Sequence, residues 1–346
     1  MRTLPPLLIT VVLISCGAPA TSGVPTAAPS VTASASVAPS ATPGPSVTAA
    51  PMRSPTTSPT PIPLPSFAML SAPTGDVVWA LVAGTRLFHS ADRGAIWDER
   101  LLPPFPPTDI AFISDREGWL LSAGSPATQC MVQAFAIWHT ADGATTWERT
   151  YQSDLFDALC KDSLFFSDGQ HGYLTLFSPN SPAIVARTAD GGRTWSRSRP
   201  FPDPPGFTTQ NAGFVIRARR VQVFGAVLLV SAVGEGAGNG KTYAFRSTDG
   251  GATWSHVSTA PEDRVDIVFV TATRWLQIVP PTASTETTDG GASWHAFATD
   301  YSQAAPTAPQ IVFGDARVGY ATVRGAIQRT TDGGGHWSAI ETPGTH

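Results

Sequence analysis

One eight-residue motif recurs six times along this 346-residue chain and constrains its fold more than any other feature. The copies follow [Ser/Thr]-x-Asp-x-Gly-x-[Thr/Ser]-Trp with few departures, and their successive tryptophans lie 50, 48, 59, 40 and 43 residues apart. A repeat of this length with a turn signal is the period of a β-propeller blade. Every copy keeps its aspartate and its tryptophan, which are Asp92 and Trp97, Asp142 and Trp147, Asp190 and Trp195, Asp249 and Trp254, Asp289 and Trp294, and Asp332 and Trp337.

The chemistry of the motif is local. The aspartate can accept hydrogen bonds from backbone N–H groups of the turn, the glycine allows a positive φ, and the Ser or Thr hydroxyl can close a second bond. We therefore interpret the six copies as structural hairpin turns rather than as ligand or metal sites. Ala144 replaces the glycine in the second copy, while Ile96 and His336 replace the hydroxyl residue in the first and last copies. We expect those turns to be distorted.

Each repeat contains enough β-forming segments for four strands. In the last repeat they are Gln310–Phe313, Val318–Val323, Ala326–Thr330 and Trp337–Ile340, and the motif forms the hairpin between the third and the fourth. The sequence predicts an all-β domain, a single β-propeller of six four-stranded blades that follows a disordered linker. A seventh blade without the motif stays open, because the 59-residue interval before Trp254 could hold extra strands.

The first 16 residues are typical of a bacterial export signal. Arg2 precedes the apolar stretch Leu7–Ile14, which is too short to span a bilayer. The stretch ends in Leu-Ile-Ser-Cys16, which resembles a lipobox and implies a lipid on the sulfur of Cys16. An ordinary signal peptide cut near Ala18–Ala20 is the alternative. We expect export and a lipid anchor on the outer face of a bacterial membrane, at the cell surface.

Residues 17–66 are rich in Pro, Ser, Thr and Ala, and Arg53 is the only charged residue among them. This composition has no core-forming period and favours a disordered, extended tether. At about 3.1 Å per residue, fifty residues could reach roughly 150 Å. Residues 67–346 then form the predicted propeller.

The composition of the chain excludes several classes of function. The formal net charge is −4 and only two lysines occur, so no basic stripe is available for nucleic acid. No metal-ligand spacing, nucleophile elbow or phosphate-binding loop appears. We therefore expect a monomer with no metal and no cofactor.

Two cysteines remain once Cys16 is assigned to the lipid. Cys130 falls in the loop between the second and third strands of the second repeat, and Cys160 falls in the link to the third repeat. In an up-and-down propeller these loops share one face. We predict a Cys130–Cys160 disulfide, which would contribute about 3–4 kcal/mol through the entropy of the unfolded chain. Two independent buried thiols are the alternative.

The same face carries long links between blades that contain aromatic and charged residues. Such residues suit a protein or glycan surface, while solvated links with locally packed rings remain an equal alternative. The candidate binding residues are Phe105, Phe156, Phe201, Phe207, Glu235, Glu262, Arg264 and Tyr301.

The recurring motif resembles the Asp-box, or BNR repeat. The chain also resembles the photosystem II assembly and stability factors over most of residues 67–346. The shared pattern is Gly-[Trp/Tyr] followed by Thr-x-Asp-Gly-Gly-x-x-Trp, as in residues 172–195 and 319–337. This resemblance implies a non-catalytic propeller that holds membrane-protein partners. It also implies seven blades, whereas six motifs occur here.

Sialidases and xyloglucanases also carry Asp-boxes, so the resemblance includes glycoside hydrolases. A sialidase would use three arginines, an acid/base Asp and a Tyr–Glu pair, yet its Arg-Ile-Pro segment is missing here. We therefore favour a lipid-anchored, non-catalytic scaffold that binds a protein or glycan at the cell envelope. The alternative is an exported glycoside hydrolase of sialidase-like fold.

Overall fold

A computed structural model describes residues 68–124, 130, 133–151, 159–178, 182–206, 215–235, 240–280, 283–302, 310–323 and 326–341. The segments predicted as signal and linker lie outside the described residues, as do Cys16, Phe156 and Phe207. Glu235 is described only by its place in a strand.

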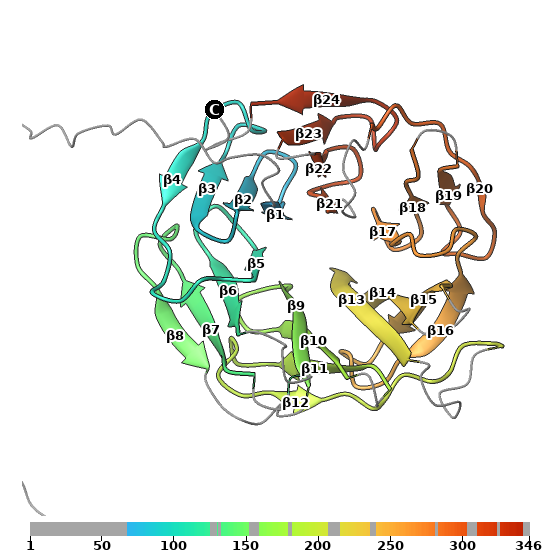
Figure 1. Cartoon of the computed structure of the whole chain (residues 1–346), viewed down its shortest axis with the longest axis horizontal. Coiled ribbons are helices and arrows are strands. Elements are labelled where there is room, and N and C mark those ends of the chain that lie inside the picture. The colour runs from blue at the N-terminus through green and yellow to red at the C-terminus, as the bar shows by residue number, and fades with distance from the viewer. Residues whose placement is uncertain are drawn as a thin grey trace, which may run out of the picture. The chain divides into compact units, whose positions relative to one another are not determined.

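The described chain folds into six separate four-stranded antiparallel sheets arranged around a ring (Figure 1). Blade 1 contains β1 (Ala68–Ser71), β2 (Val78–Val82), β3 (Arg86–Ser90) and β4 (Asp98–Arg100), and blade 2 contains β5 (Asp109–Phe112), β6 (Gly118–Ala123), β7 (Phe135–Thr140) and β8 (Glu148–Tyr151). Blade 3 contains β9 (Cys160–Phe166), β10 (Gly172–Phe177), β11 (Ile184–Thr188) and β12 (Ser196–Arg197), and blade 4 contains β13 (Val215–Phe224), β14 (Val227–Glu235), β15 (Thr242–Ser247) and β16 (Ser255–Thr259). Blade 5 contains β17 (Val268–Phe269), β18 (Trp275–Gln277), β19 (Thr285–Thr287) and β20 (His295–Ala296), and blade 6 contains β21 (Ile311–Phe313), β22 (Gly319–Val323), β23 (Ala326–Thr330) and β24 (Trp337–Ile340).

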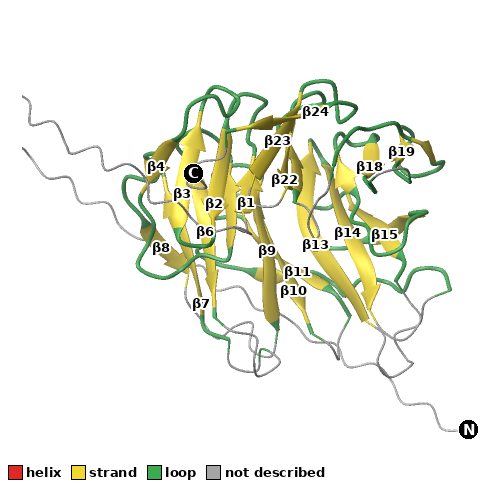
Figure 2. Cartoon of the chain, turned by 45° about the horizontal axis from the view of Figure 1, so that its top comes forward, coloured by secondary structure: helices red, strands yellow, loops and turns green. Residues whose placement is uncertain are grey.

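These sheets confirm the predicted six-bladed, all-β propeller. Strands β23 and β24 have the predicted bounds, and no seventh blade occurs in the part of the chain that the structure describes. The first strand of every blade faces the centre of the ring and the fourth lies at its edge (Figure 1). The loops gather at the two ends of the strands (Figure 2). None of the described segments forms a helix long and apolar enough to cross a lipid bilayer.

The second motif copy shows how the hairpins are held. The Oδ1 of Asp142 accepts hydrogen bonds from the backbone N–H groups of Thr145 and Thr146, both at 3.0 Å. Its Oδ2 accepts the hydroxyl of Thr146 at 2.7 Å. Gly143 and Ala144 have positive φ values of 75° and 63°. The distortion expected at Ala144 is therefore absent, because alanine takes the left-handed conformation that glycine takes in the third, fourth, fifth and sixth copies.

These bonds predict an acid-sensitive hairpin. Hydrogen bonds from Thr146 lower the pKa of Asp142 to about 2. A carboxyl group whose pKa is lowered in the folded protein stabilises the fold at a pH above its pKa in the unfolded chain, which is near 4. This stabilisation is lost as the pH falls through about 2. Asp142→Asn removes the titration, so the variant should lose less stability than the parent between pH 4 and pH 2. Urea midpoints at pH 6, 4 and 2.5 check this, and parallel losses in the two proteins would contradict it.

Aromatic stacking joins neighbouring blades. Trp79 on β2 stacks on Phe112 at the end of β5, with ring centroids 3.7 Å apart and planes 7° apart. Trp119 on β6 stacks in the same way on Phe166 at the end of β9, at 3.8 Å and 4°. Both tryptophans are completely buried. The aromatic residue on the second strand of these repeats therefore packs one blade against the next.

The ring closes between blades 6 and 1 without an exchanged strand, since each described sheet contains four consecutive strands. Residues of β1–β3 and β21–β23 share one hydrophobic core instead. At the centre of this seam the hydroxyl of Tyr320 donates a hydrogen bond to the carbonyl of Gly75 at 2.8 Å. The Nε1 of Trp97 donates to the carbonyl of Glu341 at 3.0 Å. Side-chain bonds and packing therefore close the propeller.

Tyr320 gives this seam a dependence on alkaline pH. Burial raises its pKa to about 12, so its stabilising effect is complete below pH 10 and is lost as the pH rises through 12. Tyr320→Phe should lower the free energy of unfolding by about 1–2 kcal/mol at pH 7, because the carbonyl of Gly75 loses its partner. The variant should then lose less stability than the parent between pH 10 and pH 12. Equal losses over this range, measured by urea unfolding, would refute the role given to Tyr320.

Candidate functional site

A cavity with a volume of about 630 Å³ lies on the ring axis among the described residues. All six blades line it through the ends of their first strands and the turns that follow, from Ser71 in blade 1 to Asp315 in blade 6. We call this space the wide cavity, and the side of the ring to which those turns belong the turn face. From the sequence we expected the binding surface on the opposite face, which carries the links between blades. The described residues instead place the larger cavity at the turn face.

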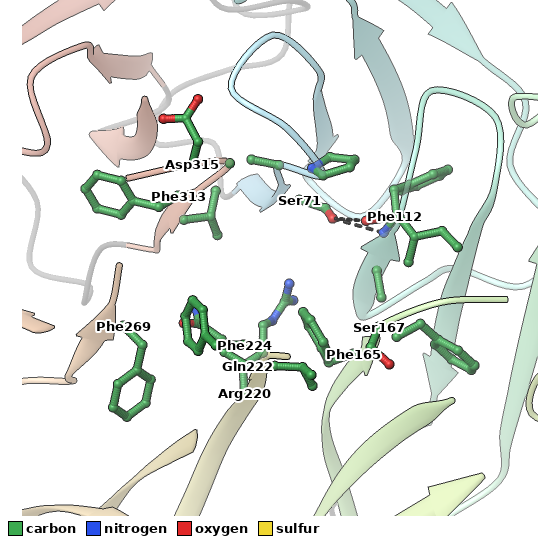
Figure 3. Close-up of a pocket in the computed structure, with 18 of the residues that line it drawn as sticks. Ser71, Phe112, Phe165, Ser167, Arg220, Gln222, Phe224, Phe269, Phe313 and Asp315 are labelled. Carbon is green, nitrogen blue, oxygen red and sulfur yellow. Dashed lines mark hydrogen bonds between the residues drawn. The ribbon is translucent and has the colours of Figure 1, made fainter. Parts of the chain in front are cut away.

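Strand alternation decides which side chains reach the wide cavity. The ring of Phe166 is buried in a stack on Trp119, and the preceding residue, Phe165, alternates to the other side of the strand and lines the cavity (Figure 3). On β13, Arg220, Gln222 and Phe224 alternate and share the inner face. Phe165 and Phe224 are only partly buried. The cavity therefore offers two accessible aromatic walls.

Arg220, one of the residues that line the wide cavity, takes part in a buried ion pair. Arg220 extends from β13 in blade 4 to the carboxylate of Asp109 on β5 in blade 2. The Asp109 side chain is fully buried and also accepts hydrogen bonds from the backbone N–H of Leu164 at 2.7 Å and the hydroxyl of Ser163 at 3.0 Å. Burial raises the pKa of Asp109, and Arg220 opposes that shift. The pair therefore joins three blades across the axis.

Two carboxylates lie on the rim, and both serve their own turns. The Oδ1 of Asp168 accepts the backbone N–H groups of Gln170 and His171, both at 2.8 Å. Burial opposes these bonds, yet together with the His171 side chain they lower the pKa of Asp168. The Oδ1 of Asp315 accepts the N–H groups of Arg317 and Val318, both at 2.7 Å. Each carboxylate therefore holds the turn that follows its own first strand.

A second cavity of about 210 Å³ adjoins the first and shares Arg220 and Gln222 with it. It is lined by earlier parts of the first strands, and we call it the narrow cavity. Its lining includes Asp162 and Asp266. Arg217 pairs with Asp162 through two hydrogen bonds of 2.6 and 2.9 Å, and Arg219 lies 3.3 Å from Asp266. Burial raises the pKa of Asp266, and Arg219 opposes that shift.

Two of the predicted binding residues are buried, as expected for the alternative in which the rings of the links pack locally. Phe201 is 4% exposed and packs against Phe245 and Trp254 of blade 4. Tyr301 is 2% exposed and donates a hydrogen bond to the carbonyl of Thr322 in blade 6 at 3.0 Å. Each ring follows the last strand of one blade and fills the space beside the next. These link aromatics therefore hold blades together.

The remaining described candidates lie where a partner could reach them. Phe105 is 54% exposed, and Arg264 is exposed with a φ of 62°. Glu262 is partly buried, and its backbone N–H donates to the side chain of Gln277 at 2.9 Å. No contact among the described residues joins Phe105 to Glu262 or Arg264.

The structure joins Cys130 and Cys160 in a disulfide, with Cα atoms 5.0 Å apart. The pair links the loop after β6 to the start of β9 and so ties blade 2 to blade 3. Within the described ranges no group of three His, Cys, Asp or Glu side chains is placed to hold a metal ion.

The arginines and aspartates on the ring axis were not predicted from the sequence. The signal was present in Arg217-Ala-Arg-Arg220, three arginines within a strand that must face the centre of a propeller. Their partners come from blades 2, 3 and 5, and no local pattern links them to β13. In the sequence, Phe165 and Phe224 look like ordinary aromatic residues of a β-strand, and nothing near them indicates that they line a cavity.

Residues 236–345 match the family model of the photosynthesis system II assembly factor YCF48. No curated protein sequence matches the chain. Structural neighbours include YCF48 bound to D1 peptide, at 14% identity over 83% of this chain and 88% of that one, with a TM-score of 0.46. A protein of unknown function from Dyadobacter fermentans DSM 18053 is 12% identical over 82% of this chain and 95% of that one, with a TM-score of 0.50.

The Hadza microbial sialidase Hz136 is a further structural neighbour. It is 13% identical over 79% of this chain, which spans 65% of the sialidase's length, with a TM-score of 0.50. At such identities the likeness is one of fold. The chain is thus a six-bladed propeller with a YCF48-like segment and a fold that sialidases share.

Proposed function

We propose that this chain is a non-catalytic scaffold that binds a protein or glycan partner in the wide cavity, and that a lipid on Cys16 displays it at the cell surface. The observation that carries the proposal is the wide cavity itself. Its volume of about 630 Å³ falls in the range of ligand sites. Phe165 and Phe224 supply aromatic surface, which is favoured where partners bind.

The absence of a suitable acid–base pair in the wide cavity's described lining favours binding over hydrolysis there. Glycoside hydrolysis requires two carboxyl groups on either side of the scissile bond. Asp168 and Asp315 are engaged by backbone N–H groups of their own turns. The match of residues 236–345 to the YCF48 model supports a role like that of an assembly factor.

In-cell crosslinking of the tagged, full-length chain, followed by capture and mass spectrometry, tests the scaffold. The parent should recover one or a few envelope components repeatedly, and Phe165→Ala combined with Phe224→Ala should lose them. Phe105→Ala is the matched control, since it removes an exposed phenylalanine from a link between blades. Recovery that survives the double substitution, or no enrichment with the parent, would overturn the proposal.

A glycoside hydrolase located in the narrow cavity is the second candidate. One observation favours it: Asp162 and Asp266 line the same cavity, and burial raises the pKa of Asp266 as a general acid requires. Against it, both carboxylates pair with arginine. Release of reducing ends from a panel of polysaccharides, abolished by Asp266→Asn in a folded variant, would establish this function. No release would exclude hydrolysis of those polymers.

A further inference from the structure

The narrow cavity contains buried polar atoms that have no hydrogen-bond partners among the described residues. They are Gln222 Oε1, Arg219 Nε and Asp266 Oδ1, and all three residues line this cavity. Arg219 Nε and Asp266 Oδ1 lie 3.3 Å apart and form an ion pair, but the contact does not have the geometry of a hydrogen bond. Buried polar atoms are nearly always satisfied by protein, water or ligand. Their convergence on one cavity indicates an occupant.

The unsatisfied atoms specify an occupant that both donates and accepts hydrogen bonds. Arg219 Nε can only donate, whereas Gln222 Oε1 and ionised Asp266 can only accept. A simple anion could not donate to the two acceptors, and a metal ion would be repelled by the guanidinium. A hydroxyl group carries one donor and two acceptor sites. Several hydroxyl groups on one molecule would satisfy all three atoms.

The charges around the narrow cavity favour a neutral molecule. Each of the three arginines of β13 faces an aspartate: Arg217 faces Asp162, Arg219 faces Asp266, and Arg220 faces Asp109. These pairs leave no net charge. A charged occupant would therefore lose its hydration without gaining an unpaired partner.

The remaining walls and the size set the class of the occupant. Apolar side chains complete the lining: Met69, Ile267, Val268, Phe269, Ile311 and Val312. A sugar ring presents hydroxyl groups at its edge and C–H groups on its faces, and so matches a cavity with polar and apolar walls. A volume of about 210 Å³ lies below the usual range of ligand sites, which limits any occupant to one small molecule.

We infer that the narrow cavity is a binding site for a single neutral polyhydroxy molecule of monosaccharide size. The site adjoins the wide cavity and shares Gln222 with it, whereas Arg219 and Asp266 line only the narrow cavity. Arg219 donates to a hydroxyl oxygen of the ligand, while Gln222 and Asp266 accept from its hydroxyl hydrogens. The scaffold therefore carries a small-molecule site on its axis beside its partner site.

Saturation-transfer NMR on the full-length protein tests the site with D-glucose, D-galactose, N-acetyl-D-glucosamine and glycerol as probes. At least one probe should receive saturation, and its affinity should fall at least tenfold in Arg219→Lys. That variant keeps a positive charge beside Asp266 but loses the planar Nε donor. Asp266→Asn is the second variant, in case the first does not fold. Phe224 lines the wide cavity and not the narrow one, so Phe224→Ala should bind the probe as the parent does.

Three results would overturn the inference. The first is that no probe receives saturation, which leaves water as the occupant. The second is that a probe still binds to the folded Arg219→Lys and Asp266→Asn variants. The third is that Phe224→Ala abolishes binding of the probe. Loss of the crosslinked partner in the Phe165 and Phe224 double variant is a separate readout. The scaffold and the small-molecule site can therefore fail independently.

Discussion

Replacing Arg220 with methionine should lower the free energy of unfolding at pH 7 by about 3–5 kcal/mol, because it leaves the buried Asp109 carboxylate without its partner. Asp109 is fully buried and lies on a different blade from Arg220. The substitution also removes the hydrogen bond from Arg220 Nε to the hydroxyl of Ser163 at 3.3 Å. Three blades would therefore lose a shared connection.

The pH dependence of this loss identifies its cause. Burial already raises the pKa of Asp109, and removal of Arg220 should raise it further. A carboxyl group whose pKa is raised in the folded protein stabilises the fold at a pH below its pKa in the unfolded chain. This stabilisation is lost as the pH rises through its pKa in the folded protein. The deficit of Arg220→Met should therefore shrink between pH 7 and pH 4, as measured by urea unfolding. Arg93→Met, which breaks the exposed pair with Asp76, is the control and should change little. A deficit independent of pH would show that lost packing, rather than charge, explains it.

Replacing Gly291 with alanine should cost about 2–5 kcal/mol, the sum of a left-handed backbone and an overpacked core. Gly291 has a φ of +88°, and a methyl group there would lie 2.5 Å from both the Cβ of Ser258 and the Trp275 ring. Ser258 cannot move away easily, since its hydroxyl donates to the carbonyl of Gly291 at 2.8 Å and accepts from Trp294 at 3.1 Å.

Gly250 provides the matched control in the neighbouring motif copy. Its φ is +66°, and a methyl group there would meet no atom within 4 Å. Gly250→Ala should therefore cost only the backbone term, about 1–2 kcal/mol. The two variants can be compared by urea unfolding at pH 7. Similar costs would mean that the core beside Gly291 relaxes around the methyl group.

The fold could be read from the sequence because its main determinants are local. Each motif copy carries its own hairpin bonds, as Asp142 with Thr146 shows. The bounds of β23 and β24 followed from strand alternation and from the position of the turn. Even the substitution of Ala144 for glycine left the hairpin intact, since the aspartate bonds hold a backbone conformation that alanine alone disfavours.

The candidate site could not be read in this way because it depends on distant pairs. Asp109 and Arg220 lie 111 residues apart and meet only once the ring is assembled. Phe201 lies in a Pro-rich link that suggested exposure, yet its backbone N–H donates to Ala183 at 3.0 Å and its ring fills the space between blades. Composition describes such a link correctly, but it does not reveal which side chain turns inward.

The central claim is that a partner enters the wide cavity at the turn face. A photoreactive benzoylphenylalanine placed at Phe224 in the full-length chain tests it most directly, with the same residue at exposed Phe105 as the reference. We expect a crosslinked partner from position 224 and none from position 105 after irradiation in cells. A crosslink from position 105 alone, or from neither position, would contradict the account.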